Sequence, residues 1–110
     1  MCSNNTQACF NVVKNLSETL ENCTYSYRII ENPFITDGGI TISAYGIEVE
    51  KIGMNGQEIN NIERDSVEYI SPALYKVNSL LSLLYNNNVS PVHLVDVIGE
   101  YVDEYVEDFD

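Results

Sequence analysis

The sequence predicts an α+β domain in which an antiparallel sheet of three to four strands is followed by a C-terminal helical hairpin. Apolar and polar residues alternate over much of residues 24–65, turn signals divide that region, and after residue 70 the apolar spacing changes to three or four residues. With 110 residues, 45% of them hydrophobic, the chain has the size of a single domain, 1–110, that can bury a core. We expect residues 1–8 to be disordered.

The first segment, residues 10–20, fits two structures almost equally well. Positions 9, 13, 16 and 20 form an apolar stripe at helical spacing, whereas positions 10, 12, 16 and 20 fit one face of a strand. The β-branched and Asn-rich composition favours the strand. We predict that it pairs with the next strand through a turn near Glu21–Cys23.

The second strand is predicted over residues 24–32, where Tyr25, Tyr27 and Ile29 recur at every second position. Pro33 should end this strand or confine it to an edge or bulge, because proline lacks the N–H that a strand ladder needs. The run Asp37–Gly39 then predicts a turn that leads into a third strand.

The third strand is predicted over residues 40–52, and its alternation changes phase near the middle. Ile42 and Ala44 share one face, whereas Ile47 and Val49 share the other. One extra residue would correct the phase, so we predict a β-bulge around Tyr45–Gly46.

A hairpin connection is predicted at Gly53–Gly56, because Asn-Gly is a strong signal for a tight turn. A fourth strand should follow over residues 57–65, and its apolar markers are Ile59 and Ile62.

Two helices are predicted in the last third of the chain. Ser71–Pro72 is typical of an N-cap followed by proline in the first helical turn, and a leucine-rich stripe extends this helix over residues 72–86. Asn86–Asn88 should end it. Ser90–Pro91 repeats the same start signal for a helix over 91–108, whose expected apolar stripe is Leu94, Ile98, Tyr101, Val102, Tyr105 and Phe109.

The charge of the chain is strongly acidic and unevenly distributed. Seventeen acidic residues against five basic ones give a net charge of −12, and residues 96–110 contain seven acids and no base. Such a charge is unfavourable for direct binding to nucleic acid or to anionic membranes. Solubility is the simplest explanation for the acidic helix, and a docking surface for a basic partner is the functional one. The candidate surface consists of Asp96, Glu100, Asp103, Glu104 and Glu107.

No motif indicates catalysis or a cofactor. His93 lies at the start of the last helix without a recognised nucleophile or orienting residue, so we interpret it as a surface residue. Cys2, Cys9 and Cys23 form no C-x-x-C pair, and with His93 they lack the paired spacing typical of zinc sites. Calcium-loop and phosphate-binding motifs do not occur. We therefore expect neither a metal nor a cofactor.

Three observations favour the cytoplasm. The odd number of cysteines is typical of free thiols in a reducing compartment. The N-terminal residues have no apolar stretch like that of a secretory signal, and no apolar run approaches the length of a membrane span.

Several strings resemble an uncharacterised family of small clostridial proteins, known only as a domain of unknown function. They are Tyr25–Arg28, Tyr45–Glu50 and Val89–Ile98, and the resemblance covers roughly residues 24–110. It implies a cytoplasmic bacterial protein and no catalytic residue.

The sequence thus predicts a non-enzymatic protein that acts through protein–protein contacts of its acidic C-terminal helix. One alternative is an inhibitor that mimics nucleic acid and binds a basic DNA- or RNA-binding protein. Another is a small enzyme with an unrecognised site. A homodimer is a further option, because two helices leave part of the apolar surface uncovered.

Overall fold

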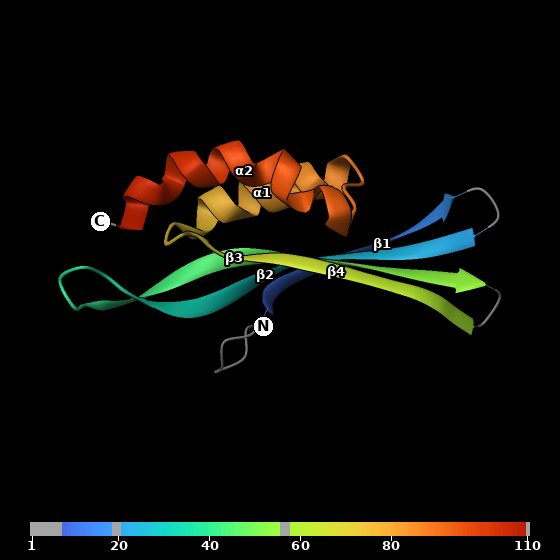
Figure 1. The fold of residues 1–110 in the computed structure, drawn as a ribbon, viewed down its shortest axis with the longest axis horizontal. Coiled ribbons are helices and arrows are strands. Elements are labelled where there is room, and N and C mark those ends of the chain that lie inside the picture. Colours follow the sequence, from blue (N-terminus) through green and yellow to red (C-terminus); the bar gives the residue numbers. More distant parts are fainter. Residues whose placement is uncertain (1–7, 19–20, 56–57, 110) are drawn as a thin grey trace.

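The computed structural model describes residues 8–18, 21–55 and 58–109. It confirms the α+β class: a four-stranded antiparallel sheet in the order β1-β2-β3-β4 carries two helices on one face (Figure 1). The elements are β1 (Ala8–Glu18), β2 (Glu21–Ile35), β3 (Thr41–Asn55), β4 (Glu58–Ser71), α1 (Leu74–Asn86) and α2 (Leu94–Tyr105), with 3₁₀ turns at Pro91–His93 and Val106–Phe109 on either side of α2.

The first segment is a strand, as its composition predicted. β1 pairs antiparallel with β2 from Ala8, opposite Ile30, to Glu18, opposite Glu21. The predicted turn at Glu21–Cys23 is wrong, because these residues already belong to β2 and the connection, residues 19–20, lies outside the described residues. The predicted disorder of residues 1–8 also falls largely outside them, except that Ala8 begins β1.

Pro33 does not end β2, which continues to Ile35. On one side Pro33 lies opposite Ser43 of β3, whereas the described pairing with β1 ends at Ile30. Within the described residues Pro33 is therefore paired on one side only, a position where a strand tolerates proline. The predicted turn at Asp37–Gly39 is confirmed: Gly39 has φ +81°, and its N–H donates to the carbonyl of Thr36 at 2.9 Å.

The predicted bulge has the right position but lies in the other strand. The β2–β3 pairing passes through Gly46 without a shift. In the β3–β4 pairing, Tyr45 is opposite Ser71 and Ile47 is opposite Val67, so the extra residues belong to β4. A Cβ on Gly46 would overlap backbone atoms of Val67 and Glu68, so β4 passes directly over this glycine.

The fourth strand is longer than predicted, and it contains both of its predicted apolar markers. β4 extends to Ser71, and its buried apolar residue is Ile70, whereas Ile59 and Ile62 are exposed. Most of the predicted Gly53–Gly56 turn belongs to β3, in which Asn55 pairs with Glu58, and the connection at residues 56–57 lies outside the described residues.

The start of α1 also corrects the prediction from Ser71–Pro72. Ser71 is the last residue of β4, α1 begins at Leu74, and its N-cap Ala73 has no side chain that could accept a hydrogen bond. The Ser71 hydroxyl instead accepts from the N–H of Ala73 at 3.0 Å, which holds the sharp turn between strand and helix.

The remaining helix boundaries agree with the sequence. α1 ends at Asn86, and Asn88 takes up φ +53° in the linker that follows. The second helical segment begins at Pro91 as a 3₁₀ turn and becomes α-helical at Leu94. Leu94 and Ile98 are buried as predicted, whereas Tyr101 is 38% exposed.

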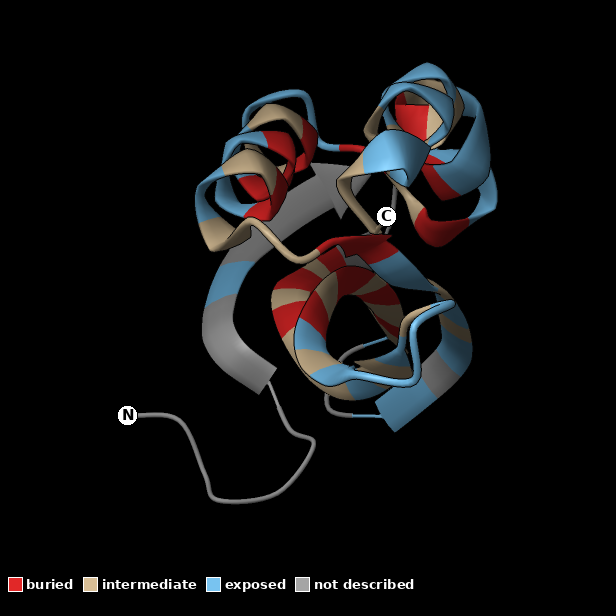
Figure 2. Ribbon diagram, turned by 90° about the vertical axis from the view of Figure 1, so that its left-hand side faces the viewer, coloured by how far each residue is buried: buried red, intermediate tan, exposed pale blue. Residues whose placement is uncertain are grey.

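The core lies between the sheet and the helices. Buried residues of both helices lie on the side toward the sheet (Figure 2). The Tyr27 hydroxyl crosses this layer and donates to the carbonyl of Val89 at 2.9 Å, which connects β2 to the linker between the helices. The largest fully buried side chains include Tyr27, Ile29, Ile47, Ile70, Leu84, Leu94 and Ile98.

Candidate interaction surface

The structure brings the five predicted surface residues together on one side of the last helical segment. Four belong to α2, and Glu107 lies in the 3₁₀ turn that follows. Asp96, Glu100, Asp103 and Glu107 recur every three or four residues and so lie on neighbouring turns. Glu104 lies next to Asp103, and each of the five is exposed. This acidic face consists of Asp96, Glu100, Asp103, Glu104 and Glu107.

Both arginines are engaged elsewhere, in a network across three strands. Arg28 of β2 pairs with Glu48 of β3 at 2.9 Å, and Arg64 of β4 pairs with Glu50 of β3. Side chains alternate along a strand, and Tyr27 faces the helices, so this network lies on the opposite face of the sheet. The sequence did not predict these ion pairs, because only the strand register reveals them.

Two lysines are engaged as well. Lys76 of α1 pairs with Asp108 at 2.7 Å, and its ammonium group lies 4.9 Å from the centre of the Tyr105 ring. The ammonium group of Lys51 lies 5.8 Å from the centre of the Tyr25 ring. Within residues 8–18, 21–55 and 58–109, the ion pairs of Arg28, Arg64 and Lys76 involve no carboxylate of the acidic face.

Asp108 is the acidic residue whose role the sequence did not reveal. The end of a helix is unfavourable for an anion, yet one carboxylate oxygen of Asp108 accepts from both Ser71 Oγ at 2.9 Å and Lys76 Nζ at 2.7 Å. The hydrogen bond from Lys76, and then that from Ser71, lower the pKa of the Asp108 carboxyl group. The same contact raises the pKa of Lys76. Asp108 therefore connects the 3₁₀ turn after α2 to the β4–α1 junction.

This contact predicts a specific pH dependence. A lowered carboxyl pKa contributes stability above the unfolded-state value of about 3.9, and a raised Lys76 pKa contributes stability below about 10.4. We expect Asp108→Asn to lower the Tm at neutral pH, and the difference from wild type to shrink as the pH falls below about 4 or rises above about 10.4. Thermal unfolding followed by circular dichroism measures this. A difference that stays constant down to pH values well below about 3.9 would contradict it.

An apolar groove borders the acidic face. It has a volume of about 290 Å³ and lies between α2 and β4. We call it the valine groove, and its lining residues are Val67, Val95, Ile98, Gly99, Val102 and Asp103. Asp103 belongs to both the groove and the acidic face.

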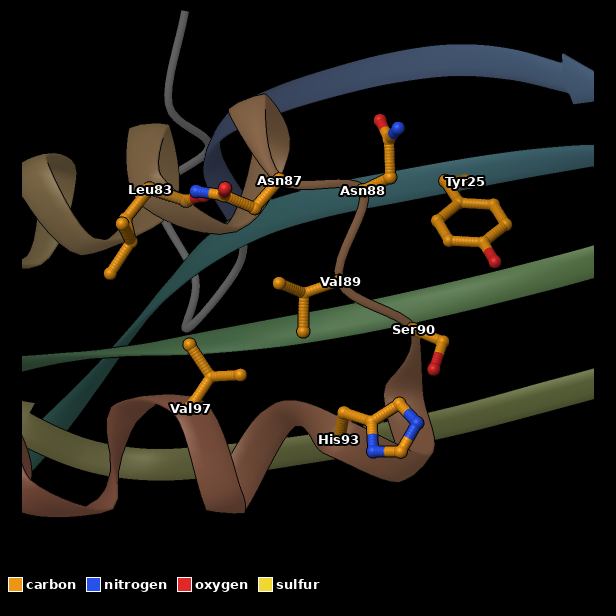
Figure 3. A pocket seen from close by; sticks show the side chains of 8 residues that line it. All are labelled: Tyr25, Leu83, Asn87, Asn88, Val89, Ser90, His93 and Val97. Atoms are coloured by element: carbon orange, nitrogen blue, oxygen red, sulfur yellow. The ribbon is translucent and has the colours of Figure 1, made fainter.

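A second hollow, of about 540 Å³, surrounds the linker between the helices (Figure 3). In Figure 3 Val89 and Val97 are turned toward each other, whereas Asn88 points away from them. His93 lines this hollow together with the polar residues Tyr25 and Ser90, and the lining contains no acidic or basic side chain apart from His93. His93 itself is exposed, in agreement with its interpretation as a surface residue.

Of the cysteines, the structure describes Cys9 and Cys23, and it places them at different ends of the same pair of strands. Cys9 lies near the end of the β1–β2 ladder marked by Ile30, whereas Cys23 lies near the opposite end and is buried. Cys2 lies outside the described residues. The described part of the chain contains no cluster of three potential metal ligands.

Fold and surface together define a small acidic α+β domain whose last helix presents an apolar groove beside a row of carboxylates. A model described as a family of unknown function (DUF6514) matches residues 6–104, so the chain belongs to this family. The match confirms the resemblance to a family of unknown function, without its clostridial origin, and extends it to the N-terminal strand. Comparisons with curated proteins and with solved structures gave no match. Among the described residues, neither helix has the length and apolarity needed to cross a bilayer.

Proposed function

We propose that this protein is a non-enzymatic cytoplasmic protein whose C-terminal helical hairpin presents the acidic face to a basic protein partner. The single observation that carries the proposal is the uncompensated charge of that face. Its five exposed carboxylates lie on one side of one helix, while the described arginines and Lys76 pair with other acids. Opposite charge on a partner would both steer the encounter and fix its orientation.

The arrangement of the carboxylates supports this proposal over nucleic-acid mimicry. A mimic of a duplex needs two rows of negative charge spaced like two phosphate backbones. The acidic residues of the candidate surface follow a single helix. A basic protein surface is therefore the better complement.

Charge neutralisation tests the proposal. We expect the variant Glu100→Gln, Asp103→Asn, Glu104→Gln, Glu107→Gln to lose the basic proteins that the wild type captures from its native cytoplasm. Binding of a purified partner should weaken with rising salt, because exposed charges are screened within about 10 Å at 0.1 M.

A matched control separates the surface from the net charge. Neutralising four exposed acids outside the acidic face changes the total charge equally and should leave capture unchanged. Equal recovery of the same proteins by wild type, surface variant and control would refute the proposed docking surface. The control variant is Asp37→Asn, Glu58→Gln, Asp65→Asn, Glu68→Gln.

A further inference from the structure

The valine groove continues along the helix as an apolar stripe. Val92, Val95 and Val106 are 66%, 54% and 60% exposed, and Gly99 and Val102 lie between them at helical spacing. At 3.6 residues per turn, Val95, Gly99 and Val102 of α2 fall within an arc of about 60°. Val92 and Val106 lie in the 3₁₀ turns at the two ends of α2. The stripe lies between the buried side of α2 and the acidic face.

The packing of the described residues does not explain why position 99, inside α2, is a glycine. Glycine inside a helix costs roughly 1 kcal/mol relative to alanine. A Cβ built on Gly99 meets no atom within 4 Å, so no neighbour in the described structure requires the missing side chain. The empty space instead hollows the helix surface, and a side chain from another molecule would fit there.

We propose that the valine groove binds an amphipathic helix of the basic partner, and this inference rests on the proposed function. A helix matches a groove that runs along α2, because apolar residues of one helix pack into the spaces between side chains of the other. The missing side chain of Gly99 lets the two backbones approach closely.

Charge complementarity selects the occupant. Asp103 lines the groove, and the rest of the acidic face borders it on one side, so lysine or arginine beside the apolar stripe of the incoming helix would meet carboxylates. A second copy of this chain is disfavoured, because each copy carries a net charge of −12 and would bring a second acidic row to the same contact.

A synthetic peptide tests the groove directly. The probe is a helix-forming peptide of about 18 residues, long enough for five turns, with leucine at positions i, i+3, i+4 and i+7 and lysine on the flanks. We expect saturable binding in calorimetry, a gain of peptide helicity, and NMR shifts at Val95, Gly99 and Val102. Binding without a helicity gain, or NMR shifts confined to other elements, would overturn the inference.

Protein variants separate the groove from the charge. Gly99→Leu fills the groove and keeps every carboxylate, and it should weaken peptide binding by about tenfold. Val95→Ser is a second variant, for the case that leucine at position 99 disturbs α2. The Val95 side chain is exposed, so this variant should fold, and it should also weaken peptide binding. Circular dichroism checks the fold of each variant. Light scattering measures self-association of the wild type, and a dimer that Gly99→Leu abolishes would show that a second copy of the chain occupies the groove.

The outcomes distinguish the two proposals. In one outcome, a peptide with serine in place of leucine binds as well as the probe, and only the double variant Glu100→Gln, Glu104→Gln weakens the binding. In that case the acidic face is the binding surface and the groove inference is wrong. If the peptide and the basic cytoplasmic proteins both fail to bind the wild type, the proposed function fails as well. Loss of binding in Gly99→Leu together with dependence on the leucine stripe supports the groove.

Discussion

Gly46→Ala is expected to destabilise the protein by roughly 3 kcal/mol, because the added methyl group has no space. The backbone carbonyls of Val67 and Glu68 lie directly where the Cβ would be placed. Backbone atoms cannot rotate away as a side-chain end can, so β4 would have to move off β3. The displacement would pull Ile70 out of the core.

Chemical denaturation measures this effect, and Gly99→Ala provides the matched control. Gly99 has open space around its Cβ position and lies in a helix, so the same change should raise stability by about 0.5–1 kcal/mol. The two substitutions should therefore have opposite signs. A Gly46→Ala protein as stable as wild type would contradict the close approach of β4.

Tyr27→Phe should lower stability by about 2 kcal/mol while leaving the ring packing intact. The Tyr27 side chain is completely buried, and its hydroxyl donates to the carbonyl of Val89. Burial, and then the neighbouring Tyr25 and Tyr85, raise the pKa of this hydroxyl, which keeps its proton available for donation. Without it, the carbonyl of the linker loses its partner in an apolar layer, where an unmade hydrogen bond is costly.

Denaturant unfolding of this variant is best compared with Tyr75→Phe, which removes the same atom from an exposed side chain. The control should be neutral. We also expect faster hydrogen exchange in the linker at residues 87–90 of the Tyr27→Phe protein, because the hydrogen bond ties that linker to β2. Equal unfolding midpoints for the two variants would show that the Tyr27 hydrogen bond contributes nothing.

The sequence was informative wherever a local pattern decides the structure. The alternation of Tyr25, Tyr27 and Ile29 identified a strand, and the helical spacing of Leu94 and Ile98 identified a helix. Burial of one face imposes a period of two residues on a strand and of about 3.6 residues on a helix. Gly39 and the Asn86–Asn88 run marked a turn and a helix end by backbone preference. These features depend on neighbours within a few residues.

The errors come from contacts between distant segments. Pro33 was predicted to end β2 or to lie at an edge or bulge, and only the strand register shows that β2 continues to Ile35. Gly46 marked the bulge correctly, but whether the extra residues lie in β3 or β4 depends on a register that the alternation of one strand does not contain. Ser71 was predicted to cap α1 and instead holds Asp108.

The candidate surface shows the same division. The helical periodicity predicted that the residues of the acidic face share one side of α2, and all five are exposed. The valine groove was not predicted, because one of its walls includes Val67 of β4 and its depth depends on the missing side chain of Gly99. A glycine at helical spacing among valines was the available signal in the sequence.

The order of the strands also has a consequence for how the chain folds. Each strand lies beside its neighbour in sequence, so every pairing in the sheet closes a short loop and carries a small entropic penalty. The helices that cover the sheet come last in the chain. The hairpins can therefore assemble early, and until α1 and α2 dock, the apolar face around Tyr27, Ile29 and Ile47 is the surface most exposed to aggregation.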